Sequence, residues 1–336
     1  MGTTGTASAP RDAWASSSPR DGRELHQRGA SIHSLIPGSM LRRSRSDVRL
    51  LVAAGAAAGL ATAFNAPIAG GVFVLEELVR RFDPRTTLAT LVASGAGFAS
   101  AHLLLHHSTA SNFHVPPLAD PSLRQAPLVV AVGVFCGLLG VPYNAAVMKS
   151  LRVVDTSRWP VVARAALIGA IVGAIGWIAP TVVGGGDNLS QQALLGAGTV
   201  AGVTGLLVLR FGLGVLSYAA CTPGGLFAPM LVLGSHLGLL VGLVGQLVAP
   251  HQTPDPAALA LIGMAAFFTA TVRAPVTGIV LATELTGSTT QLAPMLGACA
   301  IAMLTATALR SAPIYDQLTQ RAVSAFKVNA AEAHET

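Results

Sequence analysis

The residues best suited to chemistry in this chain are Gly224-Gly225-Leu226-Phe227-Ala228-Pro229, inside a stretch, residues 211–250, without Asp, Glu, Lys or Arg. Gly and Pro immediately before Leu226 end any preceding helix. A new helix that starts there tolerates Pro229 in its first turn, because an N–H at that position has no partner to lose. The first N–H groups of this helix carry the positive end of its dipole. In apolar surroundings, the motif predicts an anion site made from backbone groups alone.

The elements that must position this motif are too apolar for a soluble protein. Hydrophobic residues make up 52% of the chain and charged residues 11%, whereas soluble domains carry about 25% charged residues. The expected helical segments lie at about 51–64, 66–79, 86–105, 126–148, 161–183, 191–209, 211–220, 226–249, 257–272, 274–286 and 291–310. Many are shorter than the roughly 20 residues of a bilayer crossing or are separated by Pro-containing breaks at 65–67, 140–142 and 273–275. The pattern predicts an all-α, multi-span membrane protein of broken and re-entrant helices.

Other features of the sequence favour structural roles. Arginines cluster at 42–49 and 80–85, beside apolar segments, which is typical of cytoplasmic loops and not of nucleic-acid binding. Gly184-Gly185-Gly186-Asp187-Asn188 is interpreted as a turn followed by a helix cap, because a phosphate loop would need a preceding strand and a Lys. No nucleophile with a base and no metal-ligand spacing is present in the sequence, so we expect neither an enzyme nor a bound metal or cofactor.

A series of motifs also runs in a fixed order from about residue 45 to residue 320. They are residues 53–61, 63–67, 73–77, 184–186, 223–229, 273–278 and 313–315. Together they resemble the CLC family of chloride channels and chloride/proton antiporters. The resemblance implies a homodimer in a bacterial inner membrane, with one path for chloride in each subunit. Each subunit would consist of two inverted halves whose broken helices converge on the ions.

The resemblance also assigns chloride ligands. Gly225 would let the ion approach the backbone, Leu226 and Phe227 would donate their N–H groups to a central chloride, and Tyr315 would donate its hydroxyl to the same ion. Neutral dipoles suit transport, because a bare Arg in a low dielectric would hold the anion too tightly for release. The alternative for Tyr315 is an anchor at the membrane interface.

Two adjacent glutamates bear on the mechanism. A carboxylate at membrane depth is costly and usually serves an ion or proton path. Glu77 matches the inner proton-transfer Glu of the antiporter branch, which favours an antiporter over a channel. The alternative is that Glu76 and Glu77 only pair with arginines at 80–85. Glu284 lies near the expected end of its helix and is interpreted as structural.

The N-terminal part of the chain departs from the family pattern. Gly22-Arg23-Glu24 resembles the family's gate segment without its Gly-Pro pair, which makes Glu24 a candidate gate; the alternative is a solvated residue in a disordered tail. Nothing in the sequence matches the Gly-Ser-Gly-Ile-Pro segment that supplies a serine ligand in the family. We therefore expect an inverted-repeat fold with an incomplete first half. The expected divisions are a polar segment at 1–45, a CLC-type transmembrane domain at 46–320 and a polar tail at 321–336.

The expected function is CLC-type transport of chloride across a membrane, with exchange for protons favoured over a channel. The expected partners are chloride, protons, lipid and a second copy of the chain, and not nucleic acid. Because the gate and serine segments are incomplete, we expect the chain as given not to transport. The alternative function is a non-transporting membrane remnant, or a dimerisation partner of a CLC protein.

Overall fold

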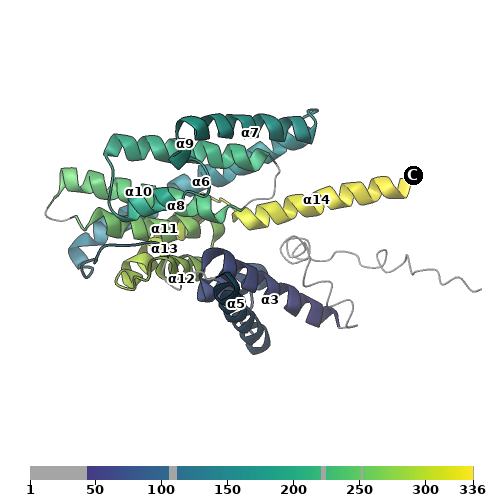
Figure 1. Cartoon of the computed structure of the whole chain (residues 1–336), viewed down its shortest axis with the longest axis horizontal. Helices are drawn as coiled ribbons and strands as arrows, with labels where there is room; N and C mark the ends of the chain where they lie inside the picture. Colours follow the sequence, from purple (N-terminus) through teal and green to yellow (C-terminus); the bar gives the residue numbers. More distant parts are fainter. Residues whose placement is uncertain (1–43, 106–111, 221–224, 251–252, 336) are drawn as a thin grey trace, which may run out of the picture.

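The computed structural model describes residues 44–105, 112–220, 225–250 and 253–335, and all regular elements in these ranges are helical (Figure 1). The elements are α3 (Arg45–Phe64), α4 (Pro67–Phe73), η2 (Val74–Val79, a π-helix), α5 (Pro84–Leu105), η3 (Leu123–Gln125), α6 (Ala126–Thr156), α7 (Val161–Ile178), η4 (Pro180–Val182), α8 (Asp187–Leu194), α9 (Val200–Ala219), α10 (Phe227–Val248), α11 (Pro256–Val272), α12 (Pro275–Thr286), α13 (Leu292–Ala308) and α14 (Ile314–Glu335). This architecture confirms the predicted all-α class.

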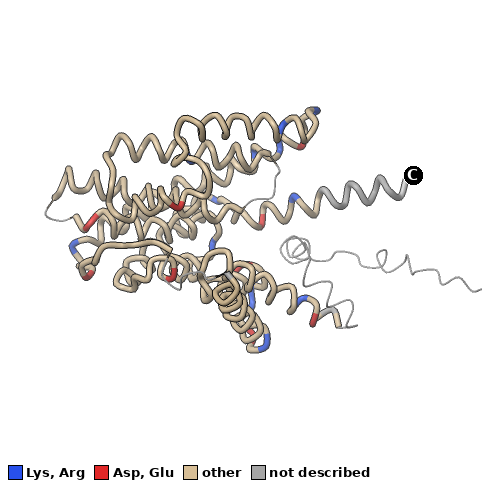
Figure 2. Tube along the Cα trace, in the orientation of Figure 1, with Lys and Arg blue, Asp and Glu red and all other residues tan. Residues whose placement is uncertain are grey.

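Within these ranges, six helices are long and apolar enough to cross a bilayer: α3, α5, α6, α7, α9 and α10. Charged residues lie mostly at helix ends, while the middle parts of the helices are almost free of charge (Figure 2). Large apolar side chains also face outward, as Trp177 and Val162 of α7 do with 90% and 80% exposure. Such surfaces are stable in hydrocarbon and not in water. The chain is an integral membrane protein.

The centre of the fold is α11, all of whose residues are buried. It packs against α6, α10, α12 and α13. The contact with α10 is close because small residues face each other: a Cβ on Gly234 would lie 2.5 Å from the carbonyl oxygen of Gly263. Close backbone contact of this kind is the usual way in which membrane helices associate. It fixes the position of α10 and therefore of its first turn.

Two predicted interruptions are wrong. The segment expected to break at 140–142 is one helix, α6, which continues through Pro142. A proline costs one backbone hydrogen bond, and packing of α6 on α11 and α13 compensates for it. The segments expected to separate at Arg210 are likewise one helix, α9. The guanidinium is accommodated because three backbone carbonyls, of residues 182, 184 and 185, accept its hydrogen bonds.

Two helical hairpins, α3–α4 and α11–α12, share one design. In each, the first helix ends at a residue with left-handed backbone, Asn65 with φ 53° or Arg273 with φ 73°. An Ala-Pro pair follows, and the proline, Pro67 or Pro275, begins the second helix. The second helices, α4 and α12, are in contact with each other. These hairpins are consistent with an inverted repeat.

The last helix, α14, extends away from the bundle in Figure 1. It runs without interruption through residue 320, where the sequence suggested a boundary between the transmembrane domain and a polar tail. The backbone that leads into it is held by two side chains of the bundle. Asn144 donates to the carbonyl of Ala312 at 3.5 Å, and Arg273 donates to the carbonyl of Ser311 at 3.0 Å. The start of α14 is thereby fixed against the buried core.

Candidate anion site

The predicted anion-binding helix is α10, whose first residue, Phe227, lies within one position of the expected start. Leu226 and Phe227 are buried, and Gly225 before them is exposed. No side chain among the described residues caps this helix. Since Pro229 has no N–H, the groups left for a ligand are the N–H groups of residues 226–228. They carry the positive end of a 22-residue helix.

Tyr315 lies close to this helix start, as the sequence predicts. It is the second residue of α14, and its ring is 6.5 Å from that of Phe227 and 5.8 Å from that of Phe73, measured between centroids. Phe73 and Phe227 also pack edge to face at 4.8 Å. The three rings join the end of α4 to the starts of α10 and α14. Tyr315 and the N–H groups of α10 are therefore part of one locality.

Glu77 belongs to the same locality and is only 7% exposed. Its Oε1 accepts a hydrogen bond from Arg80 at 2.8 Å. Arg80 also binds both carboxylate oxygens of Asp316, at 2.6 and 3.3 Å, and Asp316 follows Tyr315 directly in α14. A chain of charges thus leads from a buried carboxylate to the base of the tyrosine. Of the alternatives left open for the glutamates, Glu77 does pair with one arginine of the 80–85 cluster.

Glu76 has a different role, because its carboxylate caps the start of α12. One oxygen accepts the N–H of Val276 at 3.1 Å, and the other accepts both the N–H and the hydroxyl of Thr277 at 2.7 Å. These are the first N–H groups that α12 possesses, because it begins with a proline. A carboxylate is the preferred partner for such groups. Glu76 therefore has no bond to an arginine among those recorded for the described residues.

Glu284, at the other end of α12, caps α4 in return. Its two oxygens accept the N–H groups of Ile68 and Ala69 at 2.9 and 2.6 Å. Each glutamate stands nine residues after the proline that begins its own helix, so each helix caps the other. The starts of α4 and α12 are thus closed by carboxylates, whereas no described side chain closes α10. This contrast marks α10 as the helix start available to a mobile anion.

Two parts of the predicted site lie outside the described residues. They are the candidate gate, Glu24, and the residues that precede Gly225 in the glycine motif, Pro223 and Gly224.

Comparison with protein families gives a match to the family described as "Voltage gated chloride channel" over residues 22–307. The chain belongs to this family, the CLC family. The resemblance seen in the sequence motifs is thereby confirmed. The family match also agrees with the broken helices and with the pair of similar hairpins.

Individual CLC relatives give the same result. The H(+)/Cl(-) exchange transporter ClcA of Salmonella paratyphi A is 31% identical over 304 residues, which are 89% of this chain and 64% of the relative. ClcA of Salmonella typhimurium is 30% identical over 315 residues, or 92% of this chain and 66% of the relative. The chain therefore spans slightly less than two thirds of the length of these relatives.

Solved structures agree with the fold. A slow cyanobacterial Cl-/H+ antiporter superimposes with a TM-score of 0.79 at 29% identity, covering 87% of this chain and 69% of that one. A CLC-type fluoride/proton antiporter superimposes with a TM-score of 0.67 at 19% identity, over 85% of this chain and 68% of that one. The second likeness concerns the fold alone.

Sequence reasoning missed two features of this CLC site. The first is the reciprocal capping by Glu76 and Glu284; the repeated spacing from proline to glutamate in the two hairpins is the signal that could have indicated it. The second is Arg210, a buried cation whose carbonyl partners belong to the loop at 182–185. A lone arginine inside an apolar run was the available signal. The loop starts a helix, as expected, but Gly186 and not Asp187 is the cap residue.

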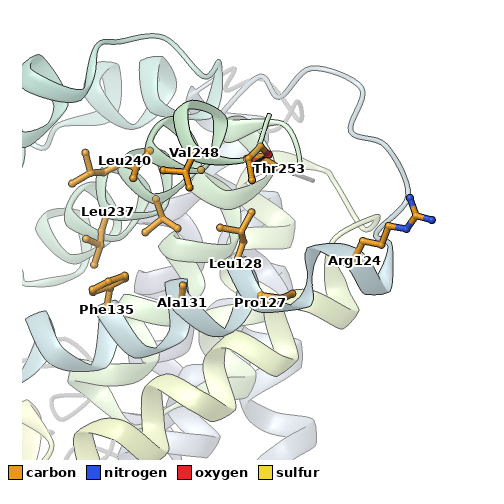
Figure 3. A pocket seen from close by; sticks show the side chains of 13 residues that line it. Arg124, Pro127, Leu128, Ala131, Phe135, Leu237, Leu240, Val248 and Thr253 are labelled. Carbon is orange, nitrogen blue, oxygen red and sulfur yellow. Dashed lines mark hydrogen bonds between the residues drawn. The ribbon is translucent and has the colours of Figure 1, made fainter. Parts of the chain in front are cut away.

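An apolar groove of about 500 Å³ lies at the far end of α10 from the anion site, between α10 and α6 (Figure 3). Its walls include Leu128 and Phe135 of α6 and Leu237 and Val248 of α10, and Arg124 stands at one end. The groove contains no helix start and only one hydroxyl side chain, that of Thr253. It is therefore unsuited to holding a small anion and is separate from the site.

Proposed function

We propose that this chain is the chloride-binding core of a CLC chloride/proton antiporter. The observation that carries the proposal is the placement of Glu77: a buried carboxylate lies in the same locality as the uncapped start of α10 and Tyr315. A channel needs no titratable group there. An exchanger needs both an anion site and a proton carrier, and these residues supply one of each.

In this proposal, the N–H groups of Leu226 and Phe227 and the hydroxyl of Tyr315 bind chloride. Gly225 keeps the approach to these groups open, because a Cβ at that position would stand 4.0 Å from the nitrogen of Phe227. All these ligands are neutral. They stabilise an anion through dipoles and still release it, which is what turnover requires.

Glu77 carries the proton in this proposal. Arg80 does not neutralise it completely, because the same guanidinium also binds Asp316. The carboxylate is therefore held in place by a shared partner and remains able to exchange a proton. The protein acts as a homodimer in a bacterial inner membrane, without a bound cofactor; the bacterial exchangers among its relatives support this assignment.

The test is simultaneous measurement of chloride and proton flux in proteoliposomes that contain the purified chain. Glu77→Gln keeps the size and hydrogen-bonding reach of the side chain but removes titration. We expect proton flux to fall at least tenfold while chloride flux continues. Asp155→Asn is the matched control, since Asp155 is a partly exposed carboxylate paired with Arg321 at 2.5 Å. An unchanged ratio of protons to chloride in Glu77→Gln contradicts the proton role.

A second pair of variants tests the chloride ligands. Gly225→Leu places a bulky side chain in front of the α10 start and should reduce chloride flux at least tenfold without changing assembly. Gly212→Leu is the control, because Gly212 is exposed on α9 with open space around its Cβ position. If the wild-type chain folds in liposomes but moves no chloride, the transport proposal fails, and the alternative of a non-transporting partner is favoured.

A further inference from the structure

A small cavity of about 170 Å³ lies between α9 and the first turn of α10. On the α9 side it is lined by Arg210, Gly214 and Tyr218, spaced four residues apart and therefore on one face of the helix. On the other side stand Gly225 and Leu226 of the anion motif. Tyr315 does not line this cavity, so the cavity is distinct from the chloride position assigned to Tyr315.

A second buried tyrosine reaches the α9 wall of the cavity. Tyr143 of α6 is fully buried, and its ring packs edge to face on Phe211 and Phe267 at 5.3 and 5.8 Å. Its hydroxyl oxygen lies 3.1 Å from the point where a Cβ on Gly214 would be. The hydroxyl thus fills the gap that Gly214 leaves, between Arg210 and Tyr218 in the row of residues on α9.

The Tyr143 hydroxyl has no hydrogen-bond partner among the described residues, although it is buried. Burial of a hydroxyl without a partner costs free energy. A phenylalanine would make the same ring contacts without this cost. The hydroxyl therefore points to a ligand that accepts its hydrogen bond.

The charge at this place favours an anion. Arg210 is 7% exposed, and its recorded partners are backbone carbonyls at 2.9 to 3.0 Å. No ion pair is recorded for it within the described part of the chain, and the one acid that it interacts with electrostatically is the exposed Asp187. Carbonyls satisfy the guanidinium's hydrogen bonds but do not cancel its charge. The positive end of the α10 dipole adds to the same potential.

We propose that this cavity is a second anion subsite, at which a small monovalent anion accepts a hydrogen bond from Tyr143 while Arg210 supplies the charge. At about 30 Å³ per water, the cavity has room for chloride, bromide or nitrate with a few waters and not for a larger metabolite. The subsite would load anions toward the start of α10, which it adjoins through Gly225 and Leu226. It rests on the proposed function, since it serves the same path.

The experiment compares wild type with Tyr143→Phe and Tyr315→Phe in two assays. One is chloride binding to the purified protein by calorimetry. The other is the location of bromide by anomalous diffraction. Tyr143→Phe should fold normally, because it removes only an unpartnered hydroxyl. We expect its chloride affinity to fall about three- to tenfold, as for loss of one hydrogen bond, and bromide to lie within hydrogen-bond distance of the Tyr143 oxygen in wild type.

Tyr315→Phe separates this subsite from the central position. Its bromide at Tyr143 should persist, whereas Tyr143→Phe should lose it. Unchanged chloride affinity in Tyr143→Phe, or wild-type crystals without bromide at the cavity, overturns the inference even if the protein exchanges chloride for protons. Failure of the proposed function has a different signature, the absence of chloride flux from the wild-type protein.

Discussion

The two hairpins, α3–α4 and α11–α12, agree in their backbone design and differ in one side chain that matters. Both have a left-handed residue, an Ala-Pro pair and a glutamate nine residues after the proline. Immediately after that glutamate, the first hairpin has Glu77 and the second has Leu285, and both are buried. The shared glutamates, Glu76 and Glu284, bond only to each other's helix start. What repeats is thus structural, and what does not repeat is the titratable group.

The hairpins also differ in their surroundings. Every residue of α11 is buried, with neighbours on all sides. Many residues of α3 are exposed, and its main contacts are with α4 and α5. The same backbone design therefore sits in the centre of the described fold in one case and at its edge in the other. Matched variants in the two hairpins separate the effect of design from the effect of environment.

The largest expected effect comes from removal of the shared caps. Glu76→Ala and Glu284→Ala should each lower the free energy of unfolding by about 2–4 kcal/mol, because each leaves two backbone N–H groups without an acceptor. Thermal unfolding in detergent measures the loss. Glu284→Gln, which keeps an acceptor oxygen, is the control and should lose about 1 kcal/mol. Unchanged melting temperatures in both alanine variants would show that the caps are not structural.

A smaller effect should come from closing the helix contacts within each hairpin. A Cβ on Gly278 would lie 2.9 Å from the carbonyl oxygen of Ala265 in α11, and a Cβ on Gly70 would lie 2.9 Å from that of Ala57 in α3. Because α11 cannot move, we expect Gly278→Ala to cost about 2–3 kcal/mol. Since α3 is at the edge and can shift, Gly70→Ala should cost about 1 kcal/mol. Equal losses in thermal unfolding would mean that the environment of the hairpin has no influence.

The left-handed residues give the next comparison. Glycine suits their backbone, so Asn65→Gly should change stability by less than about 0.5 kcal/mol. Arg273→Gly also removes hydrogen bonds to the carbonyls of Ala270 and Ser311 and should cost about 1–2 kcal/mol. Because Ser311 leads into α14, chloride binding at Tyr315 should weaken in this variant alone. Calorimetry with chloride would show whether Arg273 indeed positions Tyr315.

The sequence was sufficient for those features that depend on local pattern. The start of α10 follows from Gly225 and Pro229, and the membrane class follows from composition. Pro142 and Arg210 looked like breaks, and they are not, because the packing of α6 and the carbonyls of a distant loop compensate for them. A local pattern contains no information about such partners.

The candidate site shows the same limit. The grouping of Glu77 with Tyr315 came from family motifs, and the structure places both in one locality. The partner of Glu76 is 200 residues away in sequence, so no local rule distinguishes it from an interfacial carboxylate. The unpartnered hydroxyl of Tyr143 is visible only once α6 and α9 are in place.

The smallest effect on stability is expected for Glu77→Leu, which gives the first hairpin the side-chain type of the second. Removal of one partner of a buried ion pair usually costs about 3–5 kcal/mol, because the remaining charge is left uncompensated. Here Arg80 keeps both bonds to Asp316, and its side chain is 33% exposed, so we expect a loss below about 1 kcal/mol. Proton flux in proteoliposomes should nevertheless disappear while chloride flux continues. A variant that unfolds as readily as Glu76→Ala would place Glu77 among the structural glutamates, and the difference between the two hairpins would then have no bearing on transport.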